Sequence, residues 1–259
     1  LKLSFAKQLR RRCRRLHGTT SYFVVGALLC QFSCSFASQT RRSPMADKED
    51  ENKPRAALLL IDMQKAFTTG NWALHFGGKN EVTDIDRACA ETAKLLQSTK
   101  LPSDTPILCT KCYTDGSEDE PYLDILEPLL TRYPCIHKPT MDVTYNPAFF
   151  RWLHEQVKQG INVLVIGGCT TTSCVRVSST QIAAQLQEQG LASKVRVVVD
   201  LNLCGARKEN FSHTAHYDPV LVRLYGREFC EGKSAVDLAI VQMKRAGVEV
   251  VESSNACYW

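Results

Sequence analysis

Three residue types that can cooperate in covalent hydrolysis follow three separate apolar runs of this 259-residue chain. Asp62 follows the first run, Lys138 the third, and Cys174 lies shortly after the fourth, in the stretch GGCTTTSCVRVSS. A cysteine thiol, with a pKa of about 8.5, needs a base or a positive charge nearby to become a nucleophilic thiolate. A lysine favours the thiolate, and a carboxylate can accept the thiol proton and return it to a leaving amine. Together the three side chains indicate nucleophilic attack on a carbonyl carbon with acid–base assistance.

These residues lie in a pattern of apolar runs that alternate with helix-like segments. Several runs are apolar at every position, which is typical of strands that are covered on both faces. Strands that alternate with helices predict right-handed βαβ units. The predicted fold class is therefore α/β, a three-layer doubly wound fold with a six-stranded parallel sheet, in a domain that spans residues 54–259. The predicted strands cover residues 56–61, 106–110, 135–137, 163–166, 195–199 and 248–251.

Residues that favour helix ends mark the helices between these strands. Asn146 followed by Pro147 predicts a capped helix start. The sequence SAVD, from Ser234 to Asp237, has the pattern of a capping box. Four helices are expected. The first is capped by Asp84 and ends at about residue 98, and the second starts at Pro147 and ends at Gly160. The third starts near Cys174 and ends just before Gly190, and the fourth starts at the capping box and ends at Gly247.

Two long segments, residues 68–82 and 201–233, fit no regular element. Long irregular connections in compact domains are usually functional lids or disordered segments. Both segments contain aromatic residues, and we therefore interpret them as lids.

The catalytic candidates are expected at one edge of the sheet. In an open parallel sheet, ligands bind at the carboxyl ends of the strands, and Asp62, Lys138 and Cys174 all follow such ends. The first turn of a helix would favour a thiolate at Cys174 through the helix dipole. Position alone does not distinguish Lys138 from Lys111, which lies at the end of the second strand.

Three sequence blocks resemble the isochorismatase-like cysteine hydrolases. They are ALLLIDMQKAF, IHKPTMDVTYNPAFF and VLVIGGCTTTSCVRVSS, and they occur in this order. The resemblance implies a catalytic triad of Asp62, Lys138 and Cys174. It also implies a cis peptide bond between Cys169 and Thr170, and an oxyanion hole made by the backbone N–H groups of Thr170 and Cys174. Cys174 is then the nucleophile, and Cys169 is a packing residue.

The stretch GCTTxxCVR is most similar to the branch of N-carbamoylsarcosine and maleamate amidohydrolases. This resemblance implies hydrolysis of a C–N bond in a small linear amide or carbamoyl compound through an acyl-enzyme, with release of ammonia and without a cofactor or metal. Isochorismatases proper lack the nucleophilic cysteine. Nicotinamidases bind a metal through an Asp-x-His motif, whereas the corresponding stretch here, CYTDGSEDEPYLD, has no histidine. A nicotinamidase-like amidase and a non-catalytic binding protein that kept the fold stay as alternatives.

Further residues are candidates for binding or for different chemistry. Gln64, in the first block, and Trp72, in the first irregular segment, are substrate-binding candidates. Arg176 is a candidate to anchor a substrate carboxylate, because its guanidinium matches that group. The pair Cys109 and Cys112 has C-x-x-C spacing, so a thiol-based redox protein is a further hypothesis.

Residues 1–53 differ in composition from the rest of the chain and are interpreted as a leader and linker. Residues 1–45 contain nine Lys or Arg and no acidic residue, which leaves 23 basic and 27 acidic residues in the remainder. A basic segment before an apolar run matches a targeting peptide in outline; alternatively, translation starts at Met45. The first interpretation predicts an organellar or secreted protein and the second a cytoplasmic one.

The composition of the remainder also bears on the partners of the protein. An acidic body argues against nucleic acid as the main partner, and the apolar run of the leader is too short and too polar for a membrane span. The scattered cysteines indicate reduced thiols. The expected partner is a small-molecule amide substrate, and the family resemblance implies a homo-oligomer.

Overall fold

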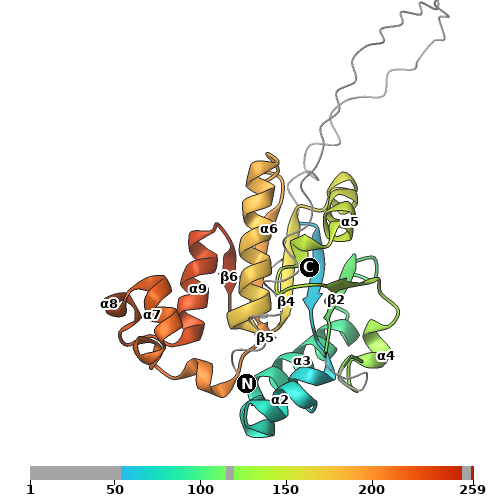
Figure 1. Ribbon diagram of the computed structural model, residues 1–259. Coiled ribbons are helices and arrows are strands. Elements are labelled where there is room, and N and C mark those ends of the chain that lie inside the picture. Colours follow the sequence, from blue (N-terminus) through green and yellow to red (C-terminus); the bar gives the residue numbers. More distant parts are fainter. Residues whose placement is uncertain (1–53, 115–119, 253–257) are drawn as a thin grey trace, which may run out of the picture. The chain divides into compact units, whose positions relative to one another are not determined.

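The computed structural model of the protein describes residues 54–114, 120–252 and 258–259. These residues form a six-stranded sheet in the order β3-β2-β1-β4-β5-β6, in which every neighbouring pair is parallel (Figure 1). The predicted α/β class and six-stranded parallel sheet are confirmed. The strands are β1 (Ala56–Ile61), β2 (Ile107–Cys112), β3 (Cys135–Lys138), β4 (Val163–Cys169), β5 (Arg196–Gly205) and β6 (Glu249–Val251).

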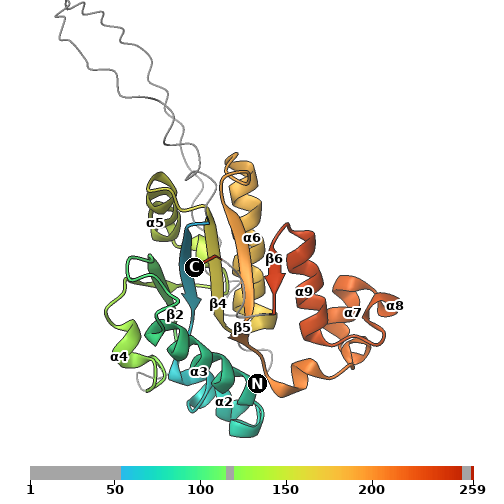
Figure 2. The same ribbon diagram turned by 180° about the vertical axis from the view of Figure 1, so that it is seen from behind.

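Helices cover both faces of this sheet, as the views from opposite sides show (Figure 1 and Figure 2). Alternate residues of β1 pack into two separate hydrophobic clusters, one with α3 and the other with α5, α6 and α9. This is why the strand is apolar at every position. The helices are α2 (Asn71–His75), α3 (Thr83–Gln97), α4 (Glu127–Leu130), α5 (Pro147–Lys158), α6 (Arg176–Glu188), α7 (Pro219–Tyr225), α8 (Arg227–Cys230) and α9 (Ala235–Arg245).

Of the capping signals at helix starts, those of α5 and α9 are confirmed and that of α3 is wrong. The Asn146 side chain accepts a hydrogen bond from the N–H of Ala148 at the start of α5, and the capping box of α9 is present at Ser234. Asp84, by contrast, lies inside the first turn of α3. Its carboxylate accepts a hydrogen bond from the N–H of Ala206 at 2.9 Å, because β5 ends close to this helix.

The two segments that we expected to be irregular contain short helices. Residues 68–82 include α2, and residues 201–233 include the end of β5 followed by α7 and α8. β5 is longer than predicted because its pairing with β4 shifts in register between Ile166 and Gly168 and then continues to Gly205. We refer to residues 206–233 as the insertion.

β1 and β4 approach each other closely where the chain has a glycine. Ile61 lies opposite Gly168 in the register of these strands. Gly168 has a φ of +138°, and a Cβ atom at this position would lie 2.2 Å from the carbonyl oxygen of Ile61. Only glycine fits both conditions. Asp62 and Cys169 directly follow this pair, so β1 and β4 leave the sheet side by side.

The leader and linker predicted for residues 1–53 lie outside the described residues. Among the residues that the structure does describe, none of the helices combines the length and the apolar character that crossing a membrane requires.

Candidate active site

Asp62 lies directly after β1, with its side chain fully buried. Its φ of +52° is in the left-handed region, which aspartate tolerates better than most residues. Its N–H donates to the carbonyl oxygen and the hydroxyl oxygen of Thr110 on β2, each at 3.2 Å. The Thr110 hydroxyl in turn donates to Asp62 Oδ1 at 2.7 Å. β2 therefore fixes both the backbone and one carboxylate oxygen of Asp62.

Lys138 is the last residue of β3, and its ammonium group pairs with the other carboxylate oxygen. Lys138 Nζ lies 2.6 Å from Asp62 Oδ2, and neither side chain is exposed to solvent. Nζ also donates to the carbonyl oxygen of Thr140 at 3.2 Å. Burial disfavours the charged ammonium, but the negative charge of Asp62 outweighs burial and raises the pKa of Lys138. Apart from the ion pair, Asp62 Oδ2 has no hydrogen-bond partner among the described residues.

Cys174 lies beside this ion pair. It belongs to the π-helical turn η4 (Thr171–Val175), and α6 begins only at Arg176. The helix expected near Cys174 therefore begins with a π-helical turn, and Cys174 lies in that turn rather than in α6. Burial and then the Asp62 carboxylate raise the pKa of the Cys174 thiol, while the ammonium of Lys138 opposes this effect. The thiol is therefore protonated at neutral pH, next to a carboxylate that can take its proton.

The turn between β4 and Cys174 has an unusual backbone. The peptide bond between Cys169 and Thr170 is cis, at the position that the family resemblance implies. The carbonyl oxygen of Thr170 accepts hydrogen bonds from the N–H groups of Ser173 and Val175. The hydroxyl groups of Thr170 and Ser173 lie 2.6 Å apart. These bonds close the turn. Cys169 itself is fully buried, which fits a packing role.

The side-chain amide of Gln64 joins the end of β1 to the end of β2 and to Glu120. Its Nε2 donates to the carbonyl oxygens of Cys112 at 3.1 Å and Glu120 at 3.3 Å. Its Oε1 accepts from the N–H of Cys112 at 2.8 Å. The amide thus imitates a backbone pairing partner for the end of β2.

Trp72, the second substrate-binding candidate, lies in α2 within an aromatic cluster. Its ring centroid lies 5.0 Å from that of Phe67 and 4.7 Å from that of Phe76. Trp72 is half-buried and packs against the hydrophobic cluster that includes α3. These contacts give it a packing role in the segment that follows β1.

Arg176, the candidate carboxylate anchor, is bound to other parts of the protein. Its Nε donates to the carbonyl oxygen of Thr172, and its Nη1 donates to Oε1 of Gln242 on α9, both at 2.9 Å. The structure therefore brings Asp62 and Lys138 together with Cys174, whereas the polar groups of Arg176 and Gln64 contact protein atoms.

Two alternatives on β2 have different surroundings. Lys111, the rival of Lys138, has its Nζ 4.3 Å from the ring centroid of Tyr122 and is not part of the ion pair. Cys109 and Cys112 are three positions apart on one strand. At about 3.3 Å per residue their Cα atoms are about 10 Å apart, with the side chains on opposite faces. This distance is too long for a disulfide, and the redox hypothesis based on this pair is wrong.

Sequence reasoning missed the positions of two residues next to the candidate catalytic residues. Thr110 binds Asp62, and Cys112 pairs in register with Lys138 across β2 and β3. Burial, and then the charge of Asp62, raise the pKa of Cys112 to about 12. Thr110 is the last residue of the second predicted strand, and Cys112 lies two residues beyond it. Extending that strand by two residues would have placed Cys112 at the same sheet edge.

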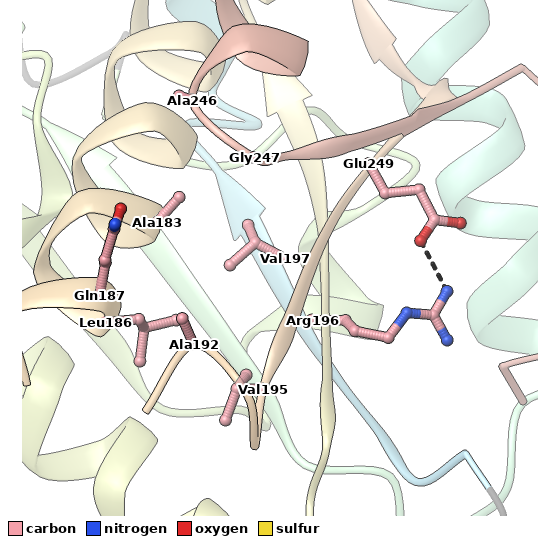
Figure 3. A pocket seen from close by; sticks show the side chains of 10 residues that line it. All are labelled: Ala183, Leu186, Gln187, Ala192, Val195, Arg196, Val197, Ala246, Gly247 and Glu249. Atoms are coloured by element: carbon pink, nitrogen blue, oxygen red, sulfur yellow. Dashed lines mark hydrogen bonds and ion pairs between the residues drawn. The ribbon is translucent and has the colours of Figure 1, made fainter. Parts of the chain in front are cut away.

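A hollow of about 200 Å³ lies at the other end of the strands, where β5 and β6 begin (Figure 3). It is lined mainly by small and apolar residues of α6, the start of β5 and the connection from α9 to β6. Arg196 and Glu249 form an ion pair at its edge, with Nη2 and Oε2 2.6 Å apart. Asp62, Lys138 and Cys174 follow the carboxyl ends of the strands, so this hollow is separate from them.

Comparison with known proteins gives one family match. The model of the isochorismatase domain matches residues 56–221, which include all three candidate catalytic residues. None of the curated proteins compared with the chain matches it significantly.

Several solved structures share the fold. A ribonuclease, MAR1, from Caenorhabditis elegans has 18% identity and a TM-score of 0.50, covering 79% of this chain and 81% of its own. The nicotinamidase PncA from Bacillus subtilis has 15% identity and a TM-score of 0.50, covering 76% and 99%. A protein from Oleispira antarctica, provisionally named an isochorismatase hydrolase, has 15% identity and a TM-score of 0.52, covering 80% and 97%. At these identities the similarity shows the fold alone.

Proposed function

The chain belongs to the isochorismatase family, and on this basis we propose that it is a cysteine-dependent amidohydrolase. Its substrate is a small linear amide or carbamoyl compound, and its products are ammonia and an acid. The observation that supports this proposal is the fully buried ion pair of Asp62 and Lys138 beside the thiol of Cys174. Burying two charges is costly, and such pairs are often retained for function rather than for stability.

In the proposed mechanism, Asp62 is the general base for the first step. Because the pKa of Cys174 is raised, proton transfer from the thiol to Asp62 Oδ2 accompanies attack of the sulfur on the substrate carbonyl carbon. The ammonium of Lys138 stabilises the charges that shift between carboxylate and thiol. The N–H groups of Thr170 and Cys174 bind the oxyanion of the tetrahedral intermediate.

The second half of the reaction uses the same groups in reverse. Protonated Asp62 donates its proton to the departing nitrogen, the C–N bond breaks, and ammonia leaves a thioester on Cys174. Asp62 then removes a proton from a water molecule, and the resulting hydroxide attacks the thioester. The C–S bond breaks, protonated Asp62 returns its proton to the sulfur of Cys174, and the acid product leaves, which restores the thiol and the carboxylate.

The test is ammonia release from a panel of simple amides, carbamoyl amino acids and nicotinamide. We expect Cys174→Ala and Asp62→Asn each to abolish ammonia release without unfolding the protein. The matched control is Cys135→Ala, which removes an exposed thiol at the start of β3, at the opposite end of that strand from Lys138. Full turnover in the Cys174 or Asp62 variant contradicts the proposal, and so does equal loss in the control.

A further inference from the structure

Arg176 begins a series of hydrogen bonds that leads from the nucleophile turn to the insertion. Its Nε holds the carbonyl oxygen of Thr172, which lies in η4 two residues before Cys174. Its Nη1 reaches Oε1 of Gln242 on α9, 66 positions further along the chain. The guanidinium thus joins the turn that carries the thiol to a helix from the last part of the fold.

The same oxygen of Gln242 accepts a second hydrogen bond. Its donor is the hydroxyl of Tyr225, the last residue of α7 in the insertion. Arg176, Gln242 and Tyr225 are all half-buried, so water competes less for these bonds than it would at the surface. A hydrogen bond from a charged guanidinium is also stronger than one between neutral groups.

The insertion is fixed to α9 by a small hydrophobic cluster of its own. Ala215 and Cys230 of the insertion pack with Leu238 of α9, and Tyr225 and Phe229 pack against them. The guanidinium of Arg245 on α9 lies 4.9 Å from the Phe229 ring centroid. In both views α7 and α8 lie next to α9 (Figure 1 and Figure 2), and α9 also packs against α6 and η4. The insertion is therefore packed against α9, and α9 in turn contacts the turn η4 that carries Cys174.

We infer that Arg176, Gln242 and Tyr225 are positioning residues that hold Cys174 in place for attack. This inference rests on the proposed function of Cys174. A displacement of 1 Å can reduce turnover about 100-fold, so a fixed Thr172 carbonyl group two residues before Cys174 affects the rate.

A second consequence concerns substrate specificity. Because two nitrogen atoms of the guanidinium are bound within the protein, Arg176 gives no preference for a substrate with a carboxylate.

The experiment compares two amide substrates of equal length, one ending in a carboxylate and one in a methyl group. kcat and KM are measured for the wild type and for Arg176→Lys, Gln242→Leu and Tyr225→Phe. The matched control is Tyr217→Phe, which removes the hydroxyl of a tyrosine in the same insertion that is 72% exposed. Thermal unfolding of each variant shows that it is folded.

We expect Gln242→Leu to lower kcat about tenfold for both substrates while KM stays within about twofold. Tyr225→Phe, which removes one hydrogen bond, should lower kcat about threefold. Arg176→Lys should act on both substrates equally, and Tyr217→Phe should match the wild type.

Two results overturn the inference. One is an increase in KM with Arg176→Lys that is confined to the carboxylate substrate, because this is the behaviour of a substrate anchor. The other is wild-type kcat in both Gln242→Leu and Tyr225→Phe. If the wild type itself releases no ammonia from any amide of the panel, the proposed function fails, and this inference fails with it before any variant is compared.

Discussion

Two ion pairs of the same length lie at opposite ends of the sheet. Lys138 and Asp62 are 2.6 Å apart with no exposure of either side chain, and Arg196 and Glu249 are 2.6 Å apart with side chains 55% and 46% exposed. Around the buried pair of Lys138 and Asp62 there is no solvent that could stabilise either charge if its partner were removed. Removing one partner of a buried pair therefore leaves an uncompensated charge, whereas water replaces either partner of an exposed pair.

The largest expected effect comes from breaking the buried pair. Lys138→Met should reduce the free energy of unfolding by about 3–5 kcal/mol, because it leaves the Asp62 carboxylate unpaired. Urea unfolding followed by circular dichroism measures this change. Adding Asp62→Asn to Lys138→Met should recover part of the lost stability, because it removes the remaining charge. A double variant that is less stable than the single one would contradict this account of the pair.

A smaller effect is expected from the hydroxyl group that fixes Asp62. Thr110→Val keeps the shape of the side chain but leaves Asp62 Oδ1 without its 2.7 Å hydrogen bond. The expected loss of stability is about 1–3 kcal/mol, with a reduced kcat for ammonia release. Thr92→Val is a suitable control, because its buried hydroxyl has no hydrogen-bond partner among the described residues. Equal losses in the two variants would show that the bond to Asp62 has no special weight.

The pH dependence of Cys174 gives a third test. Its pKa is raised in the folded protein, so the stability that comes from the protonated thiol is fully present below the unfolded pKa of about 8.5. This stability is lost as the pH rises through the folded pKa. Cys174→Ser should therefore lose less stability than the wild type between neutral and alkaline pH. Alkylation of Cys174 by iodoacetamide, followed by mass spectrometry, should be slow at neutral pH and should increase as the pH rises into the alkaline range. Complete alkylation of Cys174 at neutral pH would contradict the raised pKa.

The smallest effect is expected at the exposed pair. Arg196→Ala should change the free energy of unfolding by no more than about 1 kcal/mol, and the change should shrink further in high salt. Urea unfolding at two salt concentrations measures it. A loss as large as that of Lys138→Met would remove the contrast between the two ends of the sheet.

The sequence predicted the catalytic candidates because the carboxyl ends of parallel strands meet at one edge. Asp62, Lys138 and Cys174 could each be placed at a strand end without knowledge of the contacts between strands, although the family resemblance, and not position, favoured Lys138 over Lys111. Thr110 depends on the register of β1 against β2, which the apolar runs do not determine. The direction of the Arg176 side chain depends on Gln242, which is far away in sequence and near only after α9 has packed.

The helix α7 was missed although a signal for it was present. Asp218 followed by Pro219 is the same kind of helix start as Asn146 followed by Pro147, and the Asp218 side chain indeed accepts hydrogen bonds from two N–H groups of α7. The helix is only seven residues long. Over so few residues the periodicity of the apolar positions is too weak to separate a helix from an irregular loop.

The close approach of β1 and β4 at Gly168 limits which amino-acid substitutions the protein tolerates at this position. The strand that ends before Asp62 and the strand that leads to Cys174 approach each other at a point with no room for a methyl group. Any replacement at residue 168 would move β4 away from β1, and folding and turnover would deteriorate through the same displacement. A substitution at residue 168 therefore cannot improve turnover at the expense of stability, or the reverse. The absence of a Cβ atom at this glycine is a condition for the arrangement of the site.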